Sequence, residues 1–190
     1  MVGLIMFACF NIVAKASADS NSAPFGFRWG DDLDVVKSKL TGQYEIIDDQ
    51  ERCPFVIVKT KNLDNRIEDI GEYELLIMSK YDGISFGGLI AISYKSQPDN
   101  MKDYYPLISK IIKNLKRDYG VLQQARSIDR TERYYFFEGQ DLTINLTAEQ
   151  SKDHFYIDLE YAYTGNRNNG DTEEGFATAV EECKKQRSKH

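Results

Sequence analysis

The chain has 190 residues and a formal net charge of −6 at pH 7. An acidic chain argues against nucleic acid as a partner and against an anionic lipid surface, because phosphates attract clusters of Lys and Arg. The basic cluster at residues 184–190 ends the chain and suits a solvated tail after a helix. The length fits one domain, or two small repeats that share a core.

The first eighteen residues have the pattern of a secretory signal peptide. Met1–Val13 is almost entirely apolar, and Ala16-Ser17-Ala18 supplies the small residues that precede a cleavage site. The apolar run is shorter than the roughly 20 residues that cross a bilayer. We therefore expect residues 1–18 to be removed and residues 19–190 to be exported, to the periplasm or outside the cell. Two alternatives remain: a buried N-terminal helix or strand, and a lipid anchor on Cys9.

Two cysteines, Cys53 and Cys183, are left after this cleavage. In an oxidising compartment such a pair is a disulfide candidate, and the bond would tie the early part of the sheet to the C-terminal helix. The alternative is two unpaired thiols, because the sequence does not give the distance between the two Cα atoms.

The first half of the exported chain predicts a short helix followed by strands. Asp31 is placed to cap a helix that ends at Thr41-Gly42. From Tyr44 the hydrophobic period is two, and Gly87-Gly88 within the last strand predicts a bulge or a close backbone approach. The predicted strands are residues 44–48, 54–60, 72–81 and 84–95, the last two joined by an Asp82-Gly83 turn.

The second half predicts a long helix, four strands and a last helix. Residues 101–119 carry one apolar stripe, with Gly120 as the C-cap. The stripe consists of Met101, Tyr104, Tyr105, Ile108, Ile111, Ile112, Leu115 and Tyr119. The strands are expected at residues 121–128, 132–138, 141–147 and 154–163. The last helix is expected at 171–186, with Asp171 or Thr172 as its N-cap.

This order of elements predicts an α+β fold, with an antiparallel sheet or sheets and helices on one face. The order of helix, four strands, helix, four strands and helix also fits two fused helix-plus-four-strand units, residues 25–97 and 98–190. No residue-level repeat relates the two halves, so a duplication is a hypothesis that depends on element order alone.

The segment Phe25-Gly26-Phe27-Arg28-Trp29-Gly30, followed by Val35-Val36, resembles the entry of many small, largely uncharacterised bacterial secreted proteins. The helix-then-four-strand order is similar to the β-lactamase-inhibitor-protein-like fold and to the small lipoprotein subunit of the outer-membrane assembly machine. The resemblance implies a non-catalytic envelope protein, and the inhibitor family implies a role in protein binding. The chain lacks the lipobox of that lipoprotein, and the resemblance assigns no site residue.

The residues that usually carry catalysis are sparse. The two histidines are His154 and His190, and His154 opens a predicted strand, where an exposed histidine is common. The sequence contains no nucleophile elbow and no metal-ligand spacing. Residues 64–69 and 166–171 faintly resemble calcium loops but lack the alternating acidic ligands. We therefore expect a non-enzyme without cofactor or metal; a hydrolase that uses His154 is a third hypothesis.

Two strands with strict alternation supply the candidate functional surface. In residues 141–147 and 154–163 apolar and polar side chains alternate, so one face lies in the core and the other in solvent. Tyrosine with carboxylates on a rigid sheet suits protein recognition, and the alternative is an ordinary half-solvated sheet. If the strands are neighbours, the solvent face presents Thr143, Asn145, Tyr156, Asp158 and Glu160 together, with an aromatic ring from Tyr134 or Tyr135.

The sequence thus favours an exported, non-catalytic protein-binding module of the bacterial envelope, either an inhibitor- or immunity-like protein or an accessory subunit. Its partner would be another envelope or secreted protein, and an acidic surface with tyrosine would suit a basic one. We expect neither nucleic acid nor an integral membrane segment in the cleaved chain. The alternative is a small-molecule or lipid carrier with a groove between helix 101–119 and the sheet, its mouth lined by Phe25, Phe27 and Trp29.

Overall fold

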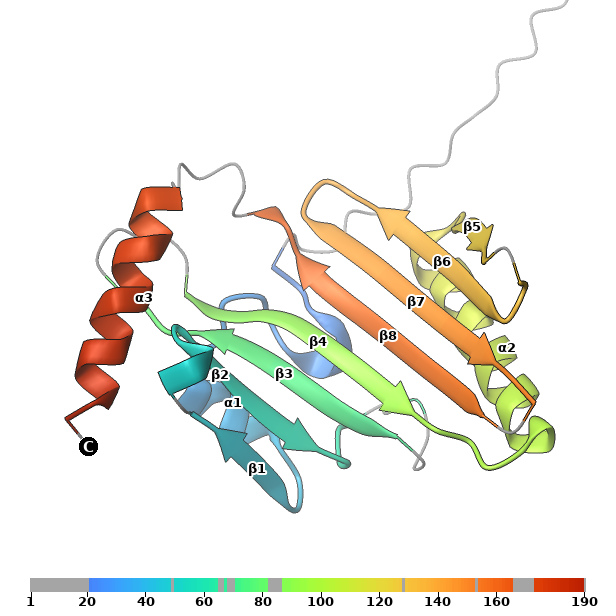
Figure 1. Ribbon diagram of the computed structural model, residues 1–190, viewed down its shortest axis with the longest axis horizontal. Coiled ribbons are helices and arrows are strands. Elements are labelled where there is room, and N and C mark those ends of the chain that lie inside the picture. The colour runs from blue at the N-terminus through green and yellow to red at the C-terminus, as the bar shows by residue number, and fades with distance from the viewer. Residues whose placement is uncertain are drawn as a thin grey trace, which may run out of the picture.

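Eight strands of the described chain form one sheet, in the spatial order β1-β2-β3-β4-β8-β7-β6-β5 (Figure 1). Every neighbouring pair is antiparallel, which confirms the predicted α+β fold. The strands are β1 (Tyr44–Ile47), β2 (Phe55–Thr60), β3 (Glu72–Met78), β4 (Gly88–Ser96), β5 (Gln123–Arg126), β6 (Glu132–Glu138), β7 (Leu142–Gln150) and β8 (Phe155–Tyr163). The computed structural model describes residues 21–48, 50–64, 67, 71–81, 87–127, 129–152, 154–165 and 173–189.

Several predictions fall outside the described residues. They are the signal peptide at residues 1–18 with the possible anchor at Cys9, the Asp82-Gly83 turn, the helix cap at Asp171 or Thr172, and most of the two calcium-like stretches.

Helices lie on both sides of this sheet. Figure 1 shows α1, η1 and α2 behind the sheet, whereas α3 stands on the viewer's side, beside the ends of β2, β3 and β4. The helices of the described chain are α1 (Leu33–Lys39), α2 (Met101–Tyr119) and α3 (Glu173–Arg187), with two short 3-10 turns, η1 (Pro24–Gly26) and η2 (Gln50–Arg52).

The sheet face toward α2 is the buried one. Alternate residues of the central strands are fully buried there: Tyr73, Leu75, Leu89, Ile92, Tyr94, Ile144, Leu146, Ile157 and Leu159. From α2, Tyr104, Leu107, Ile108, Ile111 and Leu115 complete this core.

The predicted stripe of α2 needs a correction at its edge. It omits Leu107, which is buried, and it includes Met101 and Tyr105, which are exposed. Tyr105 lies about 100° around the helix axis from Tyr104, on the side away from Leu107, and so falls at the exposed edge of the stripe. Its hydroxyl instead donates a hydrogen bond to Gln150 Oε1 at 2.8 Å.

Helix α1 begins one residue later than the sequence predicts. Asp32 is its N-cap, because Asp32 Oδ1 accepts a hydrogen bond from Val35 N at 2.8 Å. Asp31 accepts from Arg28 N at 2.9 Å and pairs with Lys39 Nζ at 2.7 Å. By position in the sequence, either carboxylate could cap the helix. In the structure Asp31 instead forms the ion pair with Lys39, and Asp32 is left to cap the helix.

The close backbone approach predicted at Gly87-Gly88 occurs at Gly88. A Cβ atom on Gly88 would lie 2.2 Å from the carbonyl oxygen of Gly30, and Gly88 has a φ of +99°. Gly30 N also donates to Leu89 O at 3.0 Å. The entry segment of the chain is thereby fastened to the start of β4, and the register of β4 on β3 shifts near this end.

The predicted disulfide is present between Cys53, just before β2, and Cys183 in α3, with 5.7 Å between the Cα atoms. Next to it, Arg187 Nη2 donates to Phe55 O at 3.3 Å, and the rings of Phe55 and Phe176 lie 6.1 Å apart. Because Phe55 alternates with the core-facing residues of β2, its side chain points to the other face. The helices on one face are thus α1 and α2, and α3 contacts the opposite face.

The two predicted halves lie side by side in this sheet. In each half a helix precedes a four-strand meander, β1–β4 in residues 25–97 and β5–β8 in residues 98–190. The halves meet where β4 pairs with β8, and one buried core runs through both. A duplication stays a prediction.

Candidate functional site

The sheet face opposite α2 carries the candidate surface. Directly paired residues of an antiparallel sheet point to the same face, so the register defines which side chains lie together. We call the outward-pointing side chains of β6, β7 and β8 the open face. They are Glu132, Tyr134, Phe136, Glu138, Thr143, Asn145, Thr147, Glu149, Tyr156, Asp158, Glu160 and Ala162. In Figure 1 no helix of the described chain lies over these three strands on the viewer's side.

The structure brings the five predicted residues onto the open face. β7 and β8 are neighbours, and Asn145 is paired directly with Glu160. Asn145 Nδ2 donates to Glu160 Oε2 at 3.5 Å, and Tyr156 Oη donates to Asp158 Oδ2 at 3.2 Å. Thr143 lies on the same face, two residues before Asn145. The five side chains therefore lie together across two neighbouring strands, and four of them form two hydrogen-bonded pairs.

Strand β6 adds two aromatic side chains to the open face. Tyr134 and Phe136 alternate along the strand and are each 37% exposed. Of the two tyrosines considered from the sequence, Tyr134 points outward and donates a hydrogen bond to Glu132, whereas Tyr135 is buried in the core. An exposed phenylalanine beside an exposed tyrosine gives this end of the face a hydrophobic character.

The open face is acidic. Its carboxylates are Glu132, Glu138, Glu149, Asp158 and Glu160, and the outward positions of these three fully described strands include neither Lys nor Arg. A surface of this composition attracts cations and basic partners.

Lys95, from the first half of the chain, borders this acidic area, and Lys59 lies farther away on β2. Lys95 on β4 is paired with Asp158, and Glu74 on β3 accepts from Lys95 at 2.5 Å and from Lys59 at 2.9 Å. Burial works to raise the pKa of the Glu74 carboxyl, but hydrogen bonds from both lysines outweigh it and hold the pKa below its usual value. Glu74 stays charged and partly neutralises the lysines, so the acidic area begins at β8.

A hollow of about 220 Å³ lies where these two areas meet. It is lined by Ser93, Lys95, Asn145, Thr147, Asp158 and Glu160. Hydroxyl, amide and carboxylate oxygens line most of it, so the hollow can accept hydrogen bonds from a cationic or amide side chain of a partner.

Tyrosine titration provides a pH test of the packing on both sides of the sheet. Burial, with Asp158 nearby, raises the pKa of Tyr156 to about 12, and burial raises that of Tyr119 in α2 to about 12. Unfolded tyrosine ionises near 10, so between pH 10 and 12 the unfolded chain loses protons before the folded chain does. We expect the free energy of unfolding to fall over this interval, and to fall less in Tyr119→Phe.

Urea unfolding at a series of alkaline pH values measures this effect. Tyr44→Phe, at an exposed position on the edge strand β1, is the control and should follow the parent protein. Identical pH slopes for the parent and Tyr119→Phe would show that the Tyr119 hydroxyl is solvated and that the packing beneath α2 is wrong.

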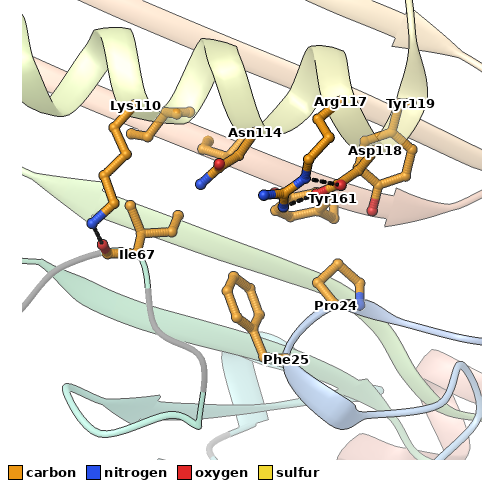
Figure 2. Close-up of a pocket in the computed structure, with 11 residues that line it drawn as sticks. Pro24, Phe25, Ile67, Lys110, Asn114, Arg117, Asp118, Tyr119 and Tyr161 are labelled. Atoms are coloured by element: carbon orange, nitrogen blue, oxygen red, sulfur yellow. Dashed lines mark hydrogen bonds and ion pairs between the residues drawn. The ribbon is translucent and has the colours of Figure 1, made fainter.

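A cavity of about 250 Å³ lies between α2, η1 and β8 (Figure 2). It occupies the position of the groove expected between helix 101–119 and the sheet. Phe25 lines it as expected, but Phe27 and Trp29 do not, because both are buried in the core, with Trp29 stacked on Tyr163. The lining residues are Pro24, Phe25, Ile67, Lys110, Ile111, Asn114, Arg117, Asp118, Tyr119, Leu159 and Tyr161.

His154 lies away from this cavity, at the start of β8. Its side chain is 49% exposed, its Nε2 lies 4.0 Å from Glu149, and its ring stacks on Tyr156 with 6.3 Å between centroids. Within the described ranges, no three His, Cys, Asp or Glu side chains are grouped so as to hold a metal ion. None of the described helices is both long and apolar enough to cross a bilayer.

Sequence reasoning missed Phe136 on the open face, and Lys95 and Glu74 on the neighbouring strands. Alternation in β3, β4 and β6 marks each of them as outward-facing. What the sequence does not show is that β4 pairs with β8, since these strands are far apart in the chain.

Comparisons with models of protein families, with curated proteins and with solved structures give no match for this chain. The open face and the cavity are the two candidate sites of the described chain.

Proposed function

We propose that this chain is an exported, non-catalytic protein-binding module of a bacterial envelope, and that it binds its partner through the open face. The observation that carries the proposal is a sheet face that no helix of the described chain covers, with two aromatic side chains at 37% exposure beside a cluster of carboxylates. Exposed aromatic residues grouped on a monomer surface are typical of interaction sites.

The chemistry of the open face indicates the kind of partner. Tyr134 and Phe136 offer a large contact area and lose little side-chain entropy on binding, because each has two rotatable bonds. Asp158 and Glu160 favour Lys or Arg on the other side, and such charge complementarity raises the association rate and the specificity. The partner is thus a protein with a basic patch around an apolar spot.

The rigidity of the open face supports direct binding without rearrangement. β7 pairs along its whole length with β8, and its residues 143–149 pair with β6. The side chains are held in their rows before a partner arrives, and preformed surfaces of this kind change little on binding. An inhibitor- or immunity-like protein and an accessory subunit would both use such a surface.

The disulfide supports the export half of the proposal. Cys53 and Cys183 form a bond that persists in oxidising compartments and is rare in the cytosol. The periplasm or the exterior of the cell is therefore the proposed location.

Affinity capture from the envelope extract of the producing organism tests the binding role. The bait is the tagged, disulfide-bonded protein, and the test variant is Asp158→Lys with Glu160→Lys. The control variant, Asp99→Lys with Glu181→Lys, makes the same charge change at exposed positions away from the open face. We expect one stoichiometric partner with the parent and the control, and at least tenfold weaker binding by the test variant.

Two outcomes would contradict the proposal. Equal capture by the test and control variants would place the binding site elsewhere on the molecule. Recovery of a lipid or small molecule in place of any protein would favour the carrier alternative.

A further inference from the structure

We propose that the cavity beneath α2 is a binding site for a small organic monoanion with a single ring or a short apolar body, such as an aryl carboxylate. This site lies on the opposite side of the sheet from the open face, so the inference stands or falls independently of the protein-binding role.

The size of the cavity limits the ligand. A volume of about 250 Å³ lies below the roughly 300–1,000 Å³ of sites for drug-sized molecules. A dry cavity of roughly 150 Å³ accommodates benzene. The volume therefore matches one ring with a short polar group.

The walls of the cavity combine an apolar floor with polar groups at its opening. Leu159 and Tyr161 from β8 form part of one side, and Ile111 of α2 forms part of the other. Figure 2 shows Lys110 extending from α2 to Ile67, and Asn114 and Arg117 on the same side of α2, across the cavity from Phe25 and Pro24 on the η1 turn. Apolar and polar side chains thus share the lining, so a ligand here needs both an apolar body and a polar group.

The charge at the opening favours an anion. Lys110, Asn114 and Arg117 are spaced at i, i+4 and i+7, so they share one side of α2. Asp118 pairs with Arg117 at 2.7 Å, and the charged side chains among the described lining residues, Lys110, Arg117 and Asp118, sum to one positive charge in a chain whose net charge is −6. Lys110 Nζ reaches across the opening to donate to Ile67 O at 3.1 Å. An anion that enters here meets donors from two turns of the helix.

The tyrosines in the lining add neutral donors. Burial raises the pKa of Tyr119 to about 12, and burial also raises the pKa of Tyr161 well above its usual value. Both hydroxyls keep their protons at neutral pH. They can donate to a carboxylate without repelling it.

The backbone at Phe25 adopts a left-handed conformation. Phe25 has a φ of +62°, which is uncommon for a non-glycine residue and costs of order 1–3 kcal/mol. This conformation places the ring in the cavity wall, edge-on to Tyr73 at 5.2 Å and to Tyr161 at 6.1 Å. Glycine would relieve the strain but would remove this wall.

Benzoate is the probe that tests the site, with neutral benzamide as its isostere and myristate as the lipid. Two-dimensional NMR of the disulfide-bonded protein follows the methyl groups of Ile111 and Leu159 and the side-chain amide of Asn114. The test variant is Lys110→Gln with Arg117→Gln. The matched control is Lys113→Gln with Lys116→Gln, which removes the same charge from exposed positions of the same helix outside the cavity.

We expect millimolar benzoate to shift the three reporter groups, and the test variant to weaken binding about tenfold or more, as expected for charge-assisted hydrogen bonds. The control variant should bind benzoate within twofold of the parent. The proposal is overturned if benzamide binds as well as benzoate, if the control variant loses as much affinity as the test variant, if myristate alone shifts the reporters, or if no probe shifts them.

Discussion

Replacing both Cys53 and Cys183 with alanine is expected to lower the free energy of unfolding by about 4–5 kcal/mol. The bond closes a loop with a sequence separation of 130 residues, and it fastens α3 to the start of β2. In the chain-entropy model a loop of this length gives a stabilisation near the upper end of the usual range, because the cross-link restricts the unfolded chain most when the loop is long. Both cysteines are buried, so a polar replacement such as serine would add the cost of burying a hydroxyl group. Alanine avoids this cost.

Chemical denaturation of the parent and the double variant measures this loss. The parent under a thiol reductant is the control and should match the double variant, whereas reductant should leave the double variant unchanged. A double variant as stable as the oxidised parent would show that α3 is held by its other contacts, among them the ion pair of Arg187 with Asp48.

Gly88→Ala is the second substitution with a large expected effect, a loss of about 4 kcal/mol. Two costs add at this position. The φ of +99° disfavours any L-residue, and the new Cβ would lie 2.2 Å from the carbonyl oxygen of Gly30. That oxygen belongs to the backbone, so the clash can be relieved only by moving the entry segment away from β4.

Gly120→Ala separates the two costs. Gly120 has a φ of +89°, but a Cβ there would meet no heavy atom within 4 Å. The free energy of unfolding of Gly120→Ala should therefore fall only by the conformational cost of a positive φ, about 1–3 kcal/mol. Thermal and urea unfolding of both variants give the comparison, and an equal loss in the two would mean that Gly30 and β4 are farther apart than the structure shows.

The regular elements could be predicted from the sequence because their side chains repeat with a clear period. α2 and β6 have the predicted bounds, at residues 101–119 and 132–138. β7 extends to Gln150, beyond the predicted end, since Ala148 is buried opposite Ile157 and alanine gives only a weak hydrophobic signal.

The positions that sequence reasoning missed are set by tertiary contacts. Asp31 and Asp32 are equivalent as caps until Lys39 approaches Asp31 from the end of α1. Phe25, Phe27 and Trp29 are all aromatic residues of the entry segment, so the sequence does not distinguish them. In the fold, Phe27 and Trp29 follow the η1 turn and are buried in the core. The sequence alone does not show these contacts, because each depends on how the entry segment packs against the rest of the fold.

The candidate surface was partly predictable for the same reason. Alternation within β7 and β8 identified Asn145 and Glu160 as outward-facing, and the short connection between these strands made them neighbours. The lysine border came from β4, whose pairing with β8 joins the two halves of the chain. Local pattern gives the face of each strand, and only the strand order gives the whole surface.

Site-specific photo-crosslinking in the producing cells tests the protein-binding role of the open face most directly. A photoreactive amino acid replaces Asn145, an exposed residue near the centre of the face, and in a second strain it replaces Lys113, an exposed residue on the outer side of α2. The structure predicts that illumination joins position 145 to one envelope protein and leaves position 113 without that adduct. The same adduct from both positions, or none from position 145, would contradict a partner bound on the open face.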